Sequence, residues 1–195
     1  MDGTIAMLPN EAALAARAMA EPAAFVAIYD HYFPRVYNYV RYRVRETDAA
    51  DDITSEVFER AWVNMGRYRS ERAPFAVWLF AIARNAVNDH LRAQWRRRWL
   101  SFEALHDRPS SDPQPEEITA RNETRARLLL AVAHLSERER DILGLKFGAG
   151  LTNRNIGELA GLSESNVGVI LYRAVRRLRA ELCATERDHG QARLG

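Results

Sequence analysis

Residues 75–99 read FAVWLFAIARNAVNDHLRAQWRRRW, and this stretch decides the class of fold. It begins aromatic and apolar, becomes polar in the middle, and ends in three arginines between Trp95 and Trp99. Apolar residues recur at steps of three and four, which predicts one helix with a buried stripe. The apolar first half would suffice for a fully buried helix, and the charged last half would suffice for a fully solvated one. We therefore interpret this helix as half core and half nucleic-acid surface.

The segments before it are also expected to be helical, because sustained period-two alternation is missing and β-branched clusters are scarce. Pro22 is suited to open a helix that runs toward Val44, with Pro34 bending it or splitting it in two. Thr47 is the expected N-cap of the next helix, which should end at Gly66. The sequence thus predicts an all-α fold.

A change of composition divides the chain. The segment HDRPSSDPQPEE, residues 106–117, is rich in proline, serine and acid, which is typical of a flexible linker. We expect two small helical domains joined by this acidic linker, the second containing a helix-turn-helix. The expected boundaries are an N-terminal extension 1–21, a first domain 22–99, a linker 100–122, a second domain 123–185 and a tail 186–195.

The second domain carries the strongest local motif, TNRNIGELAGLSESNVGVILYRA at residues 152–174. Thr152 and Ser163 are good caps for two successive helices, and Gly161 lies where the turn favours a left-handed backbone. Gly157 is small where the helices should cross closely. This spacing favours a helix-turn-helix, although an ordinary helical hairpin in an all-helical core is an alternative. Earlier in the domain, Ser136 and Glu139 predict a capping box for a helix ending near residues 147–148.

In such a motif the second helix enters the major groove, and its first side chains reach base edges while arginines hold phosphates. The expected base-facing residues are Ser163, Ser165, Asn166 and Tyr172. The expected phosphate-binding residues are Arg173, Arg176 and Arg177.

The polar face of the helix at 75–99 is the second candidate surface. It carries Arg84, Asn85, Asn88, Asp89 and Arg92. Asparagines can bind base edges, and arginines can hold the backbone or stack on bases. Alone, a solvated charged face is the simpler explanation. The helix-turn-helix on the same chain shifts the balance toward nucleic-acid binding.

Composition narrows the class of function. The net charge is only +2, but all basic residues except Lys146 are arginines, and they cluster on both sides of the acidic linker. A GC-rich genome would also favour arginine. The single cysteine, Cys183, excludes an internal disulfide and a cysteine zinc cluster. Signs of a metal site, a phosphate-binding glycine loop, a signal peptide or a membrane span are not found, so we expect no cofactor, no catalytic residue, no membrane insertion and a cytoplasmic protein.

Four motifs in order carry a resemblance to a known family. They are DDITSEVFERAW (51–62), FAVWLFAIARNAVNDHLRAQWRRR (75–98), LSERERDILGLKF (135–147) and LTNRNIGELAGLSESNVGVILYRAVRRLR (151–179). Together they resemble bacterial RNA polymerase sigma factors of the sigma-70 family, and more narrowly the extracytoplasmic-function (ECF) group. The resemblance covers about residues 25–98 and 128–182.

The resemblance implies roles for these segments. The first domain would bind core RNA polymerase and the melted minus-10 strand, with Phe80, Asn85 and Asp89 on the strand-binding surface. The loop 67–73 would hold a flipped-out base. The polymerase-binding helix would present Asp52, Ser55, Glu56, Phe58 and Glu59. The second domain would bind the minus-35 duplex of promoter DNA, and an anti-sigma factor is the expected inhibitory partner.

The sequence also departs from the family pattern. Ser55 stands where glutamine is common, which changes the expected polymerase contact. Gly168 and Val169 replace a basic residue and a serine, so the minus-35 preference cannot be copied from other members. Glycine inside a helix is costly, which suggests a close backbone approach at Gly168.

Two other functions are compatible with a helix-turn-helix. A dimeric regulator would need an apolar dimer seam, and a DNA-processing enzyme would need an acidic metal cluster. Neither feature is visible in the sequence.

Overall fold

The computed structural model describes residues 11–18, 20–44, 46–102 and 120–192, and every regular element within these ranges is helical. The first region contains α1 (Glu11–Ala18), α2 (Pro22–Arg43), α3 (Thr47–Asn64), a 3-10 turn (Met65–Arg67) and α4 (Phe75–Phe102). The second contains α5 (Ala120–Ala133), α6 (Glu137–Leu143), a π-helical turn (Gly144–Gly148), α7 (Asn153–Ala160) and α8 (Glu164–Ala192). The predicted all-α class is confirmed, whereas most of the predicted linker lies outside the described residues.

Local signals in the first region hold with two corrections. α2 begins at Pro22 as expected and continues through Pro34 as one helix, so of the two alternatives at Pro34, a bend or a split, the split is wrong. α3 begins at Thr47 itself, after an N-cap at Glu46 that makes no side-chain cap. The prediction of Thr47 as the N-cap is therefore wrong by one residue, a typical error at helix ends.

Capping in the second region follows the sequence closely. The Ser136 hydroxyl accepts from the Glu139 backbone N–H, and the Glu139 carboxylate accepts from the Ser136 backbone N–H. Thr152 caps α7 through the Asn155 N–H at 3.2 Å. α8 runs to Ala192, past residue 185, where the second domain was expected to end.

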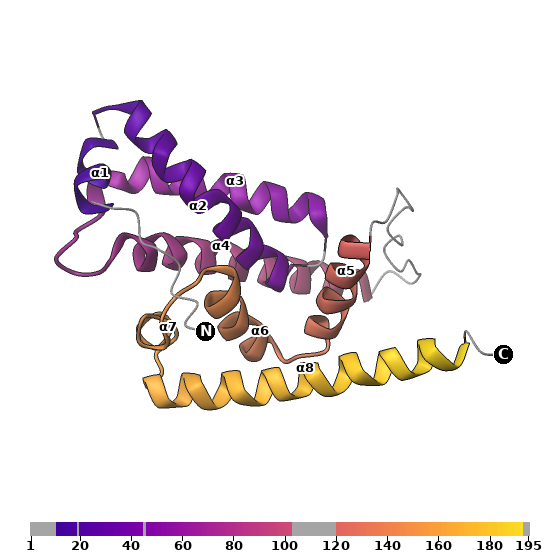
Figure 1. Ribbon diagram of the computed structural model, residues 1–195. Coiled ribbons are helices and arrows are strands. Elements are labelled where there is room, and N and C mark those ends of the chain that lie inside the picture. Colours follow the sequence, from indigo (N-terminus) through magenta and orange to yellow (C-terminus); the bar gives the residue numbers. More distant parts are fainter. Residues whose placement is uncertain (1–10, 19, 45, 103–119, 193–195) are drawn as a thin grey trace.

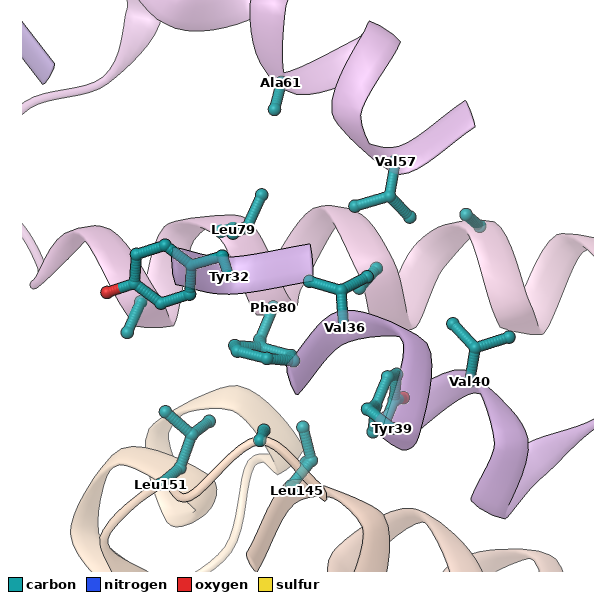
Figure 2. Close-up of a cluster of buried hydrophobic side chains, with 14 of the residues drawn as sticks. Tyr32, Val36, Tyr39, Val40, Val57, Ala61, Leu79, Phe80, Leu145 and Leu151 are labelled. Atoms are coloured by element: carbon teal, nitrogen blue, oxygen red, sulfur yellow. The ribbon is translucent and has the colours of Figure 1, made fainter. Parts of the chain in front are cut away.

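The two regions pack against each other. Figure 1 shows α6 and α7 between the bundle of α1–α4 and the long α8. One apolar cluster crosses the boundary: Tyr39 of α2 and Phe80 of α4 lie in the same core as Leu145 and Leu151 of the second region (Figure 2). A smaller cluster joins α5, α6 and α8. Burying a side chain such as Phe80 contributes about 2 kcal/mol, so this shared core stabilises the packed arrangement.

Two glycines allow this close contact. A Cβ on Gly148 would lie 2.8 Å from the Tyr39 backbone nitrogen, and one on Gly144 would lie 3.1 Å from the Tyr39 ring. The π-helical turn can therefore rest directly on α2 because Gly148 lacks a side chain, and a Cβ on Gly144 would require the Tyr39 ring to shift slightly.

Candidate nucleic-acid interface

α7 and α8 form the helix-turn-helix that the spacing predicts. Gly161 has φ 66° and ψ 39°, the left-handed conformation expected at the turn. A Cβ on Gly157 would lie 2.6 Å from the Leu162 carbonyl oxygen, so glycine is required by the close approach of the turn. By contrast, a Cβ on Gly168 would meet only the Asn153 amide nitrogen, at 3.9 Å. The predicted close backbone approach at Gly168 is therefore wrong.

The first turn of α8 presents its polar residues to solvent. Ser163, Ser165 and Asn166 are exposed, and Tyr172 is 68% exposed. The Ser163 hydroxyl accepts from the Asn166 backbone N–H at 3.2 Å, so Ser163 also caps the helix. The buried side chains Val167 and Leu171 fix the opposite face against the core. The structure thus leaves all four predicted base-facing residues accessible to solvent.

Arginines continue along α8. Arg173, Arg176 and Arg177 are exposed, and together with Glu139 they line a shallow cavity of about 400 Å³. Arg177 Nη1 donates to Glu139 Oε2 at 3.1 Å. Burial raises the pKa of Glu139, but hydrogen bonds from Ser136 and the Arg177 charge outweigh burial and hold this pKa below its ordinary value. The cluster has the charge and exposure suited to phosphates.

The predicted minus-10 face of α4 is divided. Asn85, Asp89 and Arg92 are exposed. Asp89 lies 3.5 Å from Arg92 and 3.7 Å from Arg60 of α3, so weak surface ion pairs connect α4 to α3.

The other three predicted residues of this face are covered by the second region or paired within the first. Phe80 is fully buried, with its ring 5.8 Å from the ring of Tyr39. Arg84 donates to Asp141 Oδ2 at 2.8 Å and to the Leu159 carbonyl at 3.0 Å. Asn88 accepts a hydrogen bond from Arg43. In this arrangement Phe80 has no surface to offer a DNA strand, because the shared core encloses it.

The predicted polymerase-binding helix is α3. Asp52, Ser55 and Glu59 are exposed, and Glu56 pairs with Arg60 at 2.6 Å. Phe58 is a correction, since only 4% of it is exposed and its ring packs 4.7 Å from Tyr29. Phe58 supports the surface from below and does not form part of it.

An exposed apolar strip beside Phe58 was missed by sequence reasoning. Trp62 is 42% exposed and stacks edge-on against Phe25 at 4.7 Å. Val63 is 79% exposed and Val26 is 54% exposed. The helical period of α3 assigns Trp62 to the core stripe, but Phe25 of α2 covers only part of the Trp62 ring and leaves the rest exposed.

The loop 67–73 is braced at its base by aromatic rings. Tyr68 lies 5.2 Å from Phe75 and 5.5 Å from Trp78. Residues 69–72 are exposed. The loop proposed to bind a base therefore packs on aromatic rings at its base, while its polar residues are accessible.

Sequence reasoning also missed a buried polar group between the regions. Asp141 of α6 is 5% exposed and binds Tyr39, Arg43 and Arg84. The only sequence signal is an acid placed beside Ile142 and Leu143, where helix periodicity predicts core. Its partners are more than 50 residues away, so no local pattern could identify them.

Across the described ranges, histidine, cysteine and acidic side chains do not gather in a group of three suited to a metal ion. Among the described helices, none is both long and apolar enough to cross a membrane.

Comparison with known proteins agrees with this geometry. The model of Sigma-70 region 2 matches residues 28–97, and that of Sigma-70, region 4 matches residues 131–180. ECF RNA polymerase sigma factor BldN of Streptomyces coelicolor is 34% identical over 81% of this chain and 60% of its own length. This chain therefore spans less than two thirds of that relative.

A second sequence relative and a solved structure are also similar to this chain. ECF RNA polymerase sigma factor SigD of Mycobacterium bovis is 32% identical over 77% of this chain and 73% of its own length. The sigma factor RpoE of Bartonella quintana, solved with the anti-sigma factor NepR, has the same fold, with a TM-score of 0.66, 18% identity, and coverage of 81% of this chain and 96% of that one. The helix-turn-helix, the amphipathic α4 and these matches together place the chain in the sigma-70 family of RNA polymerase sigma factors, in its ECF group.

Proposed function

We propose that this protein binds core RNA polymerase and directs it to a defined set of promoters. The second region, residues 123–185, binds the minus-35 duplex, and the first, residues 22–99, binds polymerase and the melted minus-10 strand. The observation that carries this proposal is the row of exposed polar and arginine side chains along α8, in a chain of the sigma-70 family. The protein acts in the cytoplasm as a specificity subunit and contributes no catalytic group.

The α8 surface fits duplex DNA in two ways. Ser165 and Asn166 lie at the N-terminal turn, where a recognition helix meets base edges. Arg173 and Arg176 follow on the same helix and supply phosphate contacts. A helix of this kind positions the protein through charge and selects sequence through its first turn.

The α3 surface supports polymerase docking. Asp52, Ser55 and Glu59 form a polar row, and Trp62 and Val63 extend it with exposed apolar area. Aromatic anchors beside a polar rim are the composition of a protein–protein interface.

Run-off transcription with purified core polymerase tests the proposal. Genomic fragments captured by the reconstituted holoenzyme serve as templates, and the start sites are mapped. We expect initiation from discrete sites only when this protein is added. A dimeric helix-turn-helix regulator would bind its operator but leave core polymerase unable to start there, which would refute the proposal.

We also propose an anti-sigma factor as the inhibitory partner. The support is the likeness in fold to a sigma factor solved with its anti-sigma factor, together with the exposed apolar strip on α2 and α3. Affinity purification of the tagged protein from native cells, in the uninduced state, should recover a stoichiometric partner other than polymerase. Recovery of polymerase subunits alone in that state would contradict it.

A further inference from the structure

The contact between the two regions is built around one carboxylate. Asp141 Oδ1 lies 2.6 Å from Arg43 Nη1 and accepts a hydrogen bond from the Tyr39 hydroxyl at 2.8 Å. Asp141 Oδ2 accepts from Arg84 Nε at 2.8 Å. Both carboxylate oxygens are thus held by donors that come from α2 and α4 of the first region.

These donors form a site for an oxyanion. Two guanidinium groups and a phenol converge on one position, and Arg43 also donates to Asn88 Oδ1 at 3.0 Å, which fixes its side chain. A cavity of about 230 Å³ lies beside them, lined also by Arg138 and by one further carboxylate, that of Glu137. Arginine forks bind carboxylate and phosphate oxygens with the same geometry, so the site suits a phosphodiester as well as it suits Asp141.

This oxyanion site lies on the α4 face that is proposed to bind the melted strand. Arg84 and Asn88 belong to the α4 face that also carries Asn85, Asp89 and Arg92. The second region covers the side of that face that carries Arg84, and the side that carries Asn85, Asp89 and Arg92 stays exposed. Docking of α6 is completed by the Arg35 guanidinium, which donates to the Ala149 carbonyl at 2.6 Å, and by Gly148 lying on Tyr39.

We propose that Arg43 and Arg84 form a phosphate-binding site for the melted promoter strand, and that Asp141 occupies this site in the packed arrangement as an intramolecular competitor. The proposal deepens the proposed function and rests on it. It adds Arg43, which no sequence motif singled out, to the strand-binding residues. It also makes packing of the two regions and strand binding mutually exclusive.

A strand phosphate can replace Asp141 in this site because an unpaired buried charge is costly. The Arg43 side chain is 4% exposed and the Asp141 side chain is 7% exposed, so neither ion regains water unless the regions separate. Removing one partner of such a pair is far more costly than replacing it with another of the same charge. A strand phosphate supplies that replacement anion, whereas duplex DNA bound only to α8 does not reach the site.

The test measures the separation of the regions and strand affinity together. Donor and acceptor dyes are attached to Cys183, the single and exposed cysteine, and to a cysteine introduced at exposed Ala27 on α2. The probes are an unlabelled 12-nucleotide oligothymidylate and a 12-base-pair duplex. We expect the single strand to lower energy transfer between the dyes with saturation, and the duplex to bind without lowering it.

Asp141→Asn removes the competing charge and keeps the size of the side chain. We expect low energy transfer before any oligonucleotide is added and about tenfold tighter binding of the single strand, since apparent affinity follows the open fraction. The matched control is Glu158→Gln, which removes one exposed carboxylate from α7 and should behave as the unaltered protein does.

Gly148→Ala opens the interface without touching a charge. Its Cβ would lie 2.8 Å from the Tyr39 backbone nitrogen, so the π-helical turn must lift from α2. We expect the same loss of energy transfer and the same gain in strand affinity. Gly168→Ala is its control, because there a Cβ meets only the Asn153 amide nitrogen at 3.9 Å. If Asp141→Asn loses helical content by circular dichroism, Gly148→Ala is the variant that tests whether opening the interface increases strand affinity.

Two results would overturn the proposal. One is that the single strand binds without lowering energy transfer. The other is that the variants open yet bind the strand no more tightly than the unaltered protein. Either can occur while run-off transcription succeeds, so failure of this inference is distinguishable from failure of the proposed function.

Discussion

His31 illustrates how a single side chain on α2 reports on the packing between the regions. Arg35, one turn further on, donates to His31 Nε2 at 3.3 Å and to the Ala149 carbonyl of the second region. Burial lowers the pKa of His31 below its ordinary 6.5, and the Arg35 charge lowers it further, while Glu11 opposes them. His31 is therefore stabilised in its neutral form beside a cation that bridges the two regions.

The lowered pKa of His31 determines how the free energy of unfolding depends on pH. Because the folded-state pKa lies below the unfolded value, the contribution of His31 is fully present above pH 6.5 and is lost as pH falls through the folded-state pKa. We expect His31→Gln to show a shallower loss of unfolding free energy between pH 7 and pH 5.5, measured by urea denaturation. His90→Gln on α4 serves as the matched control. Equal slopes for His31→Gln and the unaltered protein would contradict the assignment.

Other single residues show where sequence reasoning stops. Phe80 and Phe58 were placed on binding surfaces by resemblance, yet both are core residues in this arrangement. Helical period alone is consistent with either assignment, because each lies at the border of an apolar stripe. The rings of Tyr39 and Tyr29, from α2, decide it by covering them.

At the scale of elements, α8 combines two functions in one helix. Its first turns pack Val167 and Leu171 on the shared core while the opposite side stays exposed. Further along, Ala174 and Leu178 join the smaller cluster with α5 and α6. The helix is thus held by two cores in succession, which fixes the direction in which Arg173 and Arg176 point.

The arginine row predicts a measurable salt effect. Arg173→Ala should weaken binding of the isolated protein to a minus-35 duplex and reduce the slope of log K against log salt by about 0.9, the value for one phosphate contact. The slope is measured by fluorescence anisotropy over a range of potassium chloride concentrations. Arg17→Ala, which removes an exposed arginine from α1, is the control and should leave the slope unchanged. An unaltered slope for Arg173→Ala would remove this residue from the phosphate contacts.

At the scale of the whole molecule, the packed arrangement places different surfaces on different sides. α3 presents its polar row and the apolar strip of Trp62 and Val63. α4 presents the exposed side of its polar face, which begins at Asn85. α8 lies across the second region, separated from α3 by the rest of the bundle (Figure 1). Polymerase docking on α3 and strand binding on α4 use different side chains, although Asp89 of α4 lies 3.7 Å from Arg60 of α3. The two functions should therefore be separable by substitution.

Asn85→Ala tests that separation. We expect promoter opening, followed by permanganate reactivity of unpaired thymines, to fall about tenfold, because one base-edge contact is lost. Binding to core polymerase, measured by native gel shift, should be unchanged. Glu59→Ala on α3 is the converse variant and should weaken core binding first. Loss of core binding in Asn85→Ala would show that α4 is misassigned.

The amino-acid sequence determined the helices, their caps and the helix-turn-helix. These depend on neighbours within a few residues: the Ser136–Glu139 capping box, the left-handed Gly161 and the spacing of Ile156 and Val167 can all be predicted locally. The family resemblance follows from the same short-range patterns.

Only the tertiary structure decided which of the candidate residues face solvent. Arg43 and Arg84 meet Asp141 across separations of 98 and 57 residues, and Gly148 fits against Tyr39 across more than 100. Such contacts depend on how two helical regions dock, and helical periodicity carries no information about docking. For that reason α4 could be proposed as a binding helix from its sequence, while the covering of its Arg84 side by the second region could not be predicted.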